Sequence, residues 1–316
     1  MKMNEVLQIT DVLDTNIEHA YDTVARALQA TDWPRFLITE KEEIRIPKKA
    51  GRVLDVSREE IQARYLSREQ LRKDPPAGFH LIHHPMINHK LTLARSRETG
   101  EAEFERLINE ISLALSVYAT EDLEEEPVQI ATPICGAVGT QIAGMKPTIV
   151  PIWRAGEGMK PGIRSWLTNS RVGNVGLYRN HKTLLPIIYY AKMLRGLKKI
   201  AYGDVKKRAA YVCDPMLATG VSAVATIEIL KSFGYRKIKF ISILSVPQGV
   251  NAILMAHPDI EIYTAALDVG LDERGYIVPG LGDAGKRLNG TDWDDEEFDW
   301  EEWDALVEYV DGPVES

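Results

Sequence analysis

Apolar and polar residues follow a helical period in one region of this chain and form short apolar runs in another. From residue 103 to residue 120, apolar residues recur every three or four positions, which predicts one amphipathic helix. The positions that carry this period are Phe104, Leu107, Ile108, Ile111, Leu115 and Tyr118. After Gln141 the pattern changes to short apolar runs rich in Val, Ile and Tyr, with helical segments between several of them. These runs are residues 147–153, 172–178, 209–215, 238–246 and 260–268.

The apolar runs predict the fold class and suggest three segments. Strands that are apolar almost throughout are typical of a parallel sheet covered on both faces, so we predict an α/β fold with a mainly parallel, twisted sheet flanked by helices. Residues 1–76 read as a helical extension of unknown role that ends at the breaker KDPPAG. Residues 77–291 form the main domain, and residues 292–316 form an acidic tail that contains aromatic residues. We interpret this tail as a short helix that docks on the body or on a neighbouring subunit.

The charge of the chain is unevenly distributed. The net charge is −8, but 12 of the 46 acidic residues lie between Asp292 and the end, where there is no Lys or Arg. The remaining 34 acidic residues face 38 basic ones, so the body carries about +4. A mildly basic body suits a polyanionic small molecule better than a nucleic acid, which needs a dense basic face.

Signals for export or membrane insertion are not found in the sequence. The first 20 residues hold acidic side chains where a signal peptide has an apolar stretch, and no apolar run is long enough to span a bilayer. The two cysteines, Cys135 and Cys213, are too few for a disulfide framework. We therefore expect a reduced, cytoplasmic setting.

The stretch AAYVCDPMLATGVSAVATIEIL (209–230) joins a strand, a loop of small residues and a helix. Ligands of open α/β sheets bind beyond the carboxyl ends of the strands, and the N–H groups at a helix start favour an anion. Asp214 is placed to accept hydrogen bonds from sugar hydroxyls, while Thr219 and Ser222 add hydroxyl groups beside Gly220. This combination suits a phosphorylated pentose. Taken alone, the segment is explained equally well as a turn with a Thr or Ser helix cap.

Two other predicted strands lead into loops that carry arginine. The stretch VPIWRAGEGM (150–159) places Arg154 after one strand, and VGLYRNHKTLLP (175–186) places Arg179 after another. The planar guanidinium group makes bidentate contacts to phosphate oxygens, so the two arginines together suit a pyrophosphate. Three anion-suited loops at successive strand ends favour a ligand site over three unrelated turns.

The stretch DERGYIVPGLGDAGKRLNGT (272–291) matches glycine motifs of nucleotide-binding loops without their context. Arg287 stands where a Walker A loop has Ser or Thr, and no βαβ unit follows. We reject both the Walker A and the dinucleotide-binding interpretations. Pro279 and the glycines instead predict a rigid loop that hydrogen-bonds a flat heterocycle through its backbone.

From about Phe79 to Thr291 the chain resembles the uracil phosphoribosyltransferases, which have the type I phosphoribosyltransferase fold. The resemblance is carried, in the order and spacing of the family, by HHPMINHKLTLAR, VPIWRAGEGM, GLYRNHKTLLPIIYYAKM, DPMLATGVSA, VPQGV and GYIVPGLGDAGKRLNGT. It implies a parallel sheet with a small hood, a phosphoribosyl pyrophosphate (PRPP) donor, Mg²⁺ as cofactor, and dimers or higher homo-oligomers. Some bacterial members of the family respond to GTP. No partner nucleic acid or membrane is implied.

The resemblance also implies a role for each matching residue. Arg154 and Arg179 would contact the pyrophosphate of PRPP, and Asp283 would face PRPP near the base. The loop that would hold the ribose and its 5′-phosphate consists of Asp214, Pro215, Met216, Leu217, Ala218, Thr219, Gly220, Val221 and Ser222. The uracil site would consist of Ile277, Gly282, Asp283 and Ala284. None of these residues is assigned as a direct metal ligand.

The implied reaction is the attack of uracil N1 on C1 of the ribose, which gives UMP and releases pyrophosphate. Asp283, Arg154 and Asp214 would be the catalytic residues, although Asp283 has a water or magnesium contact as an alternative to the role of base. Trp153, Glu157 and Val221 depart from the usual residues of the family, which have Gly-Gly at 220–221. These departures leave two alternatives open: another small heterocycle as acceptor, or a non-catalytic protein that binds nucleotides.

Overall fold

The computed structural model describes residues 57–179, 186–192, 205–272 and 274–290, and these form an α/β fold around one large sheet. The strands of this sheet lie in the order β1-β11-β10-β8-β4-β6-β7, and every neighbouring pair is parallel except β6 and β7. Their bounds are β1 Phe79–Leu81, β11 Glu261–Leu267, β10 Lys237–Ser245, β8 Ala209–Cys213, β4 Thr148–Trp153, β6 Asn174–Arg179 and β7 Pro186–Lys192. Two short strands, β5 (Arg171–Val172) and β9 (Met216–Leu217), pair with β4 and β10.

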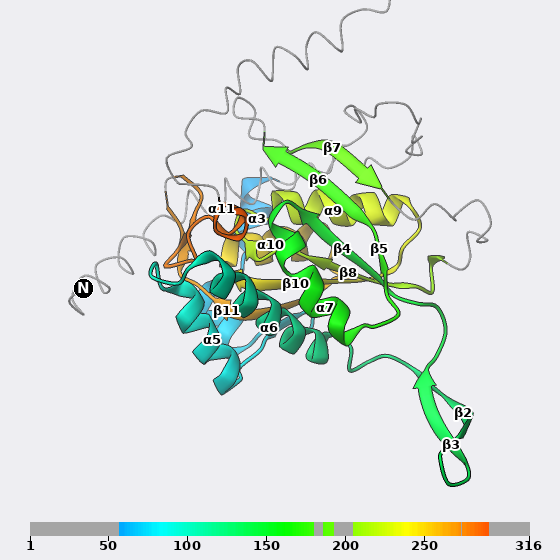
Figure 1. Ribbon diagram of the computed structural model, residues 1–316. Helices are drawn as coiled ribbons and strands as arrows, with labels where there is room; N and C mark the ends of the chain where they lie inside the picture. Colours follow the sequence, from blue (N-terminus) through cyan, green and yellow to red (C-terminus); the bar gives the residue numbers. More distant parts are fainter. Residues whose placement is uncertain (1–56, 180–185, 193–204, 273, 291–316) are drawn as a thin grey trace, which may run out of the picture.

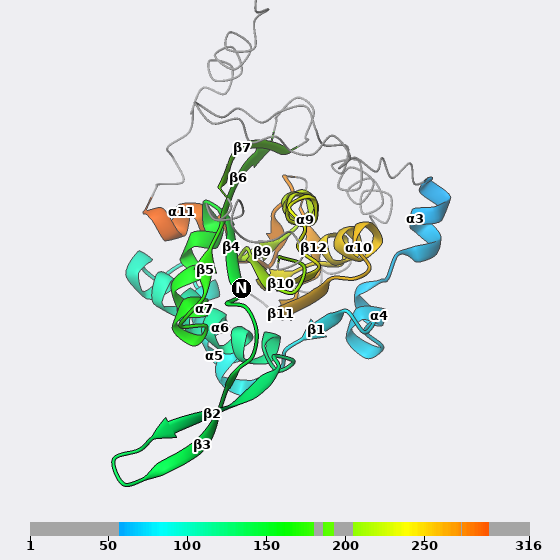
Figure 2. The same cartoon turned by 90° about the vertical axis from the view of Figure 1, so that its right-hand side faces the viewer.

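Helices cover both faces of the sheet, as the apolar strands predict (Figures 1 and 2). One face carries α5 (Pro85–Arg95), α6 (Glu101–Ala119) and α7 (Lys160–Trp166), and the other carries α9 (Val221–Ser232) and α10 (Pro247–Ala256). In β4 the side chains alternate between the two cores: Ile149 joins the core of α6, and Val150 joins the core of α9. Burial on both faces is the reason that these strands contain so few polar residues.

The predicted amphipathic helix is confirmed as α6, which begins at Glu101, two residues before the predicted start. Five of its six marked apolar residues, from Phe104 to Leu115, are fully buried, and Tyr118 is half-buried. Glu101 and Glu103 lie in its first turn, where negative charge is favoured by the helix dipole. The five predicted strands are confirmed as β4, β6, β8, β10 and β11.

Part of the predicted helical extension before residue 77 is described and is helical. Helices α3 (Arg58–Arg64) and α4 (Arg68–Lys73) are capped by Ser57 and Ser67, whose hydroxyl groups accept hydrogen bonds from the first turn. Leu71 is fully buried in the core on the α9 face, and so this part of the extension packs on the main domain. Residues 1–56 and the acidic tail 292–316 lie outside the described residues, so the predicted segment boundaries stay predictions. Among the described residues, no helix combines the length and the apolarity that crossing a bilayer requires.

The hairpin of β2 (Glu125–Ala131) and β3 (Gly136–Ile142) was not predicted, and it projects away from the body (Figure 1). Its turn carries the exposed Cys135. No residue of either strand is buried, and four large apolar side chains are exposed to solvent. These side chains are Ile130, Ile134, Val138 and Ile142.

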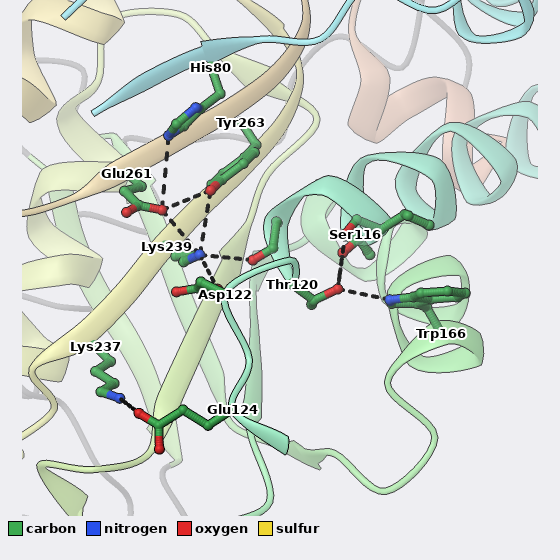
Figure 3. A network of polar contacts seen from close by, with 12 residues as sticks. His80, Ser116, Thr120, Asp122, Glu124, Trp166, Lys237, Lys239, Glu261 and Tyr263 are labelled. Carbon is green, nitrogen blue, oxygen red and sulfur yellow. Dashed lines mark hydrogen bonds and ion pairs between the residues drawn. The ribbon is translucent and has the colours of Figure 1, made fainter. Parts of the chain in front are cut away.

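A polar network at the amino end of the sheet holds the root of this hairpin (Figure 3). The ammonium group of Lys239 donates to the carbonyl of Ala119 at 3.0 Å and to Asp122 at 2.6 Å, and it lies 3.1 Å from Glu261. Tyr263 donates to Glu261 at 2.8 Å, and the ring of His80 stacks on Tyr263. The end of α6 is therefore attached to β10 and β11 at the edge of the sheet opposite to the predicted ligand site.

Candidate active site

Three residues predicted to bind the phosphoribosyl donor lie at the carboxyl ends of three strands that are neighbours in the sheet. Asp214 comes directly after β8, Arg154 directly after β4, and Arg179 is the last residue of β6. These strands lie side by side in parallel, with Pro151 opposite Cys213 and Trp153 opposite Gly176. Their carboxyl ends therefore meet at one edge, which is where ligands of open α/β sheets bind. The side chain of Arg179 lies outside the described part, and its contact with a ligand stays a prediction.

The loop after β4 packs tightly against the end of β8. It forms a short 3-10 turn, η1 (Ala155–Gly158), and Arg154 immediately before this turn is exposed. A Cβ atom on Gly156 would lie 2.4 Å from the carbonyl oxygen of Cys213, so only glycine allows this approach. The Arg154 loop is thereby held beside the residue that precedes Asp214.

Cys213 lies beneath this contact and has a packing role. Its thiol is fully buried and donates to the carbonyl of Gly156 at 3.7 Å. Burial raises the pKa of the Cys213 thiol well above its usual range, with the negative charges of Asp214 and Glu157 adding to the shift. The thiol is therefore protonated at neutral pH, which supports its assignment as a buried strand residue.

The loop from Asp214 to Gly220 lies across the end of β10. Met216 and Leu217 form β9, which pairs with β10, while Pro215 is buried. A Cβ atom on Gly249 would lie 2.7 Å from the carbonyl oxygens of both Leu217 and Ala218, so α10 supports the loop from below. The loop is thus a packed element of the sheet edge.

The start of α9 provides the backbone groups of an anion site. Gly220 precedes the helix with φ +81° and has no side chain to cap it, and only the Val221 N–H has a side-chain partner among the described residues, a long hydrogen bond to the Thr219 hydroxyl at 3.5 Å. The remaining N–H groups at the helix start favour an anion, and Thr219 and Ser222 add hydroxyl groups there. Val221 is the first helical residue, so the left-handed conformation falls on Gly220. The β-branched residue at position 221 is therefore compatible with a tight turn at Gly220.

Asp214 lies in surroundings that disfavour its charge. Burial raises the pKa of its carboxyl group from 3.8 to about 7, and a hydrogen bond from the Met216 N–H partly offsets this shift. Near neutral pH, a bound cation or a set of hydroxyl donors would therefore shift the Asp214 carboxyl group toward its ionised form. A carboxylate of this kind suits a ligand that carries both ribose hydroxyls and a metal-bound pyrophosphate.

Replacing Asp214 with asparagine should remove a pH dependence of stability between about pH 4 and pH 7. The unfolded carboxyl ionises near its ordinary pKa of 3.8, whereas the folded one keeps its proton up to about 7. The raised pKa therefore gives stability that is complete below pH 3.8 and is lost as the pH rises through about 7. Thermal unfolding of both proteins at each pH would test this. The Tm of the unsubstituted protein minus that of Asp214→Asn should fall over this range and then level off, and a flat or rising difference would contradict the prediction.

The predicted base loop is followed by a helix that was not predicted. The loop runs through β13 (Ile277–Val278), which pairs with β12 (Gly270–Leu271), and Gly280 and Gly282 have positive φ angles. The structure then forms α11 (Ala284–Asn289), where the sequence was expected to stay a loop through residue 291. The helix is defined by its ends, because Asp283 caps its start and Gly290 adopts the left-handed conformation at its end.

This helix start uses one oxygen of the predicted catalytic Asp283. Its Oδ1 accepts a hydrogen bond from the Lys286 N–H at 2.9 Å. Oδ2 has no hydrogen-bond partner among the described residues and is the oxygen that remains for a ligand. Ile277 and Ala284 are both buried. Because their side chains are apolar, only their backbone groups could form hydrogen bonds with a ligand.

The base loop and the Arg154 loop are in contact through α11. A Cβ atom on Gly158 would lie 2.5 Å from a methyl group of Leu288, and one on Gly285 would lie 3.9 Å from the Cβ atom of Ala155. The structure therefore brings the base loop, the Arg154 loop and the Asp214 loop together at one end of the sheet.

Two residues that depart from the family pattern form a small polar cluster on the Arg154 loop. The indole of Trp153 donates to Oε1 of Glu157 at 2.5 Å, and Lys160 forms an ion pair with the other oxygen of Glu157. The negative charge of Glu157 is thus balanced by Lys160 within the loop. Glu157 lies four residues after Trp153 and three before Lys160, so the cluster is local in the sequence.

The carboxylates of the site fit Mg²⁺ only together with a ligand that supplies further oxygens. Within the described ranges, no group of three or more His, Cys, Asp or Glu side chains is placed to hold a metal ion. Mg²⁺ commonly keeps several waters and binds through one or two carboxylates plus substrate phosphates. Asp214 and Asp283 at the sheet edge, beside the loop of Arg154, agree with that mode.

Comparison with known proteins identifies close relatives over two thirds of the chain. A family described as uracil phosphoribosyltransferase matches residues 81–291. The uracil phosphoribosyltransferase of Streptococcus suis is 48% identical over 213 residues, which cover 67% of this chain and 98% of that protein. The protein of that name from Listeria monocytogenes serotype 4a is 46% identical over 68% of this chain and 99% of its own. A solved structure, AQ2163 from Aquifex aeolicus, is 32% identical with a TM-score of 0.60 and covers 66% and 97% of the two chains.

Proposed function

The chain belongs to the uracil phosphoribosyltransferase family, and we propose that it transfers the phosphoribosyl group of PRPP to uracil, forming UMP and pyrophosphate in pyrimidine salvage. It is therefore a glycosyltransferase of the pentosyltransferase class. The observation that carries the proposal is the meeting of the Asp214, Arg154 and base loops at one edge of the sheet. Each loop has polar groups that would suit one part of the two substrates, PRPP and uracil.

We assign the donor to the three strand ends. The N–H and hydroxyl groups of residues 218–222 would bind the 5′-phosphate, and Asp214 would accept hydrogen bonds from the ribose hydroxyls. Arg154 and Arg179 would bind the pyrophosphate through their guanidinium groups. The remaining residues of the turn, Pro215, Met216 and Leu217, support the loop through burial and strand pairing.

We assign the acceptor to the base loop. Backbone groups of Ile277, Gly282 and Ala284 would bind the edges of the pyrimidine, so that uracil N1 faces C1 of the ribose. The free Oδ2 of Asp283 would lie near the base as a proton acceptor or as a ligand of bound water. The reaction forms the N1–C1 bond, breaks the C1–O bond to pyrophosphate, and releases the proton of N1.

The protein's contribution to this step is positioning and electrostatic stabilisation. Negative charge grows on the leaving pyrophosphate, and fixed cationic groups beside it lower the barrier. When bound with PRPP, Mg²⁺ would neutralise part of the pyrophosphate charge. Arg154 on a glycine-packed loop is held in place before the reaction begins, because η1 rests against both β8 and α11.

A base panel with the full-length protein tests the proposed function. Protein, PRPP and Mg²⁺ are incubated with uracil, cytosine, adenine, guanine or hypoxanthine, and nucleotide and pyrophosphate are quantified. We expect UMP and pyrophosphate in equal amounts with uracil, and no nucleotide when either PRPP or base is omitted. Turnover of a different base in place of uracil would show that another heterocycle is the acceptor. Binding of PRPP without turnover of any base would show a non-catalytic protein.

The family relationship supports two further proposals, one on the oligomeric state and one on GTP as an effector. We propose a homodimer or a higher homo-oligomer, supported by the four exposed apolar side chains of the hairpin, which are costly to leave in water on a monomer. A molar mass of a single chain in light scattering would contradict this. We also propose that GTP acts as an effector and that the protein works in the cytoplasm. Activity that stays unchanged across a GTP titration would exclude GTP as an effector. The cytoplasmic location stays a prediction from the two unpaired cysteines.

A further inference from the structure

A bidentate ion pair lies behind the base loop, between the end of α5 and the end of β11. Arg95 is the last residue of α5, and Asp268 follows β11 directly and is 5% exposed. Arg95 donates from Nη1 to Oδ2 of Asp268 at 2.8 Å and from Nη2 to Oδ1 at 2.6 Å. Two parallel charge-assisted hydrogen bonds fix both the distance and the angle between the two side chains.

The same pair holds both backbone polar groups of Gly280. Nη1 of Arg95 also donates to the carbonyl oxygen of Gly280 at 2.8 Å, and the N–H of Gly280 donates to Oδ2 of Asp268 at 3.0 Å. Gly280 has φ +65°, and a Cβ atom there would lie 2.1 Å from the carbonyl oxygen of Ile277. The turn at Gly280 is therefore held from two sides, and it lies between the proposed base-binding residues Ile277 and Gly282.

The other end of the base loop is attached to the same part of the molecule. Arg287 of α11 donates to the carbonyl oxygens of Ala94 at 2.7 Å and Ser96 at 2.9 Å, and to that of Leu281 at 3.0 Å. Its guanidinium group also lies 3.9 Å above the ring of Phe104. Both ends of the segment 280–287 are thus fixed to the end of α5.

We propose that Arg95 and Asp268 are positioning residues for the acceptor base. They would set the backbone of residues 280–284 in the geometry that binds uracil, without touching either substrate. The inference rests on the proposed function, since it concerns the acceptor half of the same site. A loop that reads a base through backbone groups depends on its own conformation, because a displacement of about 1 Å in a reacting complex lowers the rate by roughly 100-fold.

Asp268→Asn is the test variant, because asparagine keeps the shape of the side chain and removes its charge. The amide group has one acceptor oxygen for three donors, so the hold on Gly280 should loosen. We expect kcat/KM for uracil to fall by roughly 10- to 100-fold, chiefly through KM, while KM for PRPP changes less than about twofold. Asp259→Asn is the matched control, since it breaks the ion pair with Lys231 beside the start of β11, at the other end of this strand from Asp268, and should leave both KM values unchanged.

Two readouts separate positioning from a general loss of structure. Hydrogen exchange of the peptide that contains Gly280 should become faster in Asp268→Asn, while the peptides of α6 and β10 stay protected. Arg95→Lys, which keeps the charge but loses the bidentate geometry, should shift KM for uracil in the same direction and by less. If Asp268→Asn does not fold, Arg95→Lys alone decides the question by the same measurements.

The outcomes also separate this inference from the proposed function. An unsubstituted protein that uses a different base overturns uracil as the acceptor, and the same KM comparison is then made with that base. An active protein in which Asp268→Asn changes both KM values equally, or neither, overturns the positioning role alone.

Discussion

Replacement of Arg154 with alanine should lower kcat/KM for PRPP by about 100- to 1000-fold, the usual effect of removing one group that stabilises developing charge. Arg154 is exposed at the end of β4 and precedes a turn that is held by backbone packing. The substitution should therefore leave the fold unchanged and act on the pyrophosphate. Steady-state kinetics with varied PRPP, together with thermal unfolding, would measure both effects.

The control for this substitution is Arg164→Ala. Arg164 is an exposed arginine on α7, ten residues further along the chain. The Arg164→Ala variant should have the same kinetic constants as the unsubstituted protein. Arg154→Lys should retain part of the activity, because lysine keeps the charge but loses the two-pronged contact with phosphate oxygens. If Arg154→Ala kept the full kcat/KM for PRPP, the assignment of the loop after β4 to the donor would be wrong.

Substitution of Gly156 with alanine should damage stability and activity together. The added methyl group would lie 2.4 Å from the carbonyl oxygen of Cys213 and 3.2 Å from two backbone atoms of Pro151. Backbone atoms cannot rotate away as a side chain does, so η1 must move off the end of β8. Overpacking of this kind lowers the free energy of unfolding by about 1–3 kcal/mol. Because the same shift moves Arg154 relative to Asp214, kcat/KM for PRPP should fall as well.

Gly136→Ala provides the comparison for Gly156→Ala. A Cβ atom on Gly136, at the start of β3, meets no atom within 4 Å. Denaturant unfolding should therefore give an unchanged midpoint for Gly136→Ala and a clearly lower one for Gly156→Ala. Equal midpoints for the two variants would show that the contact between η1 and β8 is looser than the structure indicates.

Local patterns in the sequence were sufficient to predict five strands of the sheet and its main helix, but not the strands at its two ends, β1 and β7. The strands β4, β8, β10 and β11 are buried on both faces over most of their length, so each appears as a mostly apolar run. In α6 burial of one face gives the helical period. The strand–loop–helix arrangement of residues 209–230 was also predictable, because a run of small residues separates an apolar strand from a helical period.

Features that depend on contacts between distant residues were not predictable in this way. Arg95 and Asp268 are separated by 173 positions, and although Arg95 ends the stretch HHPMINHKLTLAR, nothing in either local sequence indicates that the two residues pair. The hairpin was missed because its strands contain Pro127, Gly136 and Gly139, which are unfavourable in most strands. Helix α11 was missed because it lies in a glycine-rich stretch and has no apolar period. Its ends are defined by Asp283 and Gly290.

The different environments of the two cysteines have a practical consequence for solution studies. Cys213 is enclosed beneath the Gly156 carbonyl with a protonated thiol, whereas Cys135 is exposed in the turn of the projecting hairpin. A maleimide fluorophore added to the folded protein would therefore attach at one position, without any engineered substitution. The emission anisotropy of this fluorophore would report the rotational motion of the β2–β3 hairpin, separately from ligand binding at the carboxyl ends of the strands.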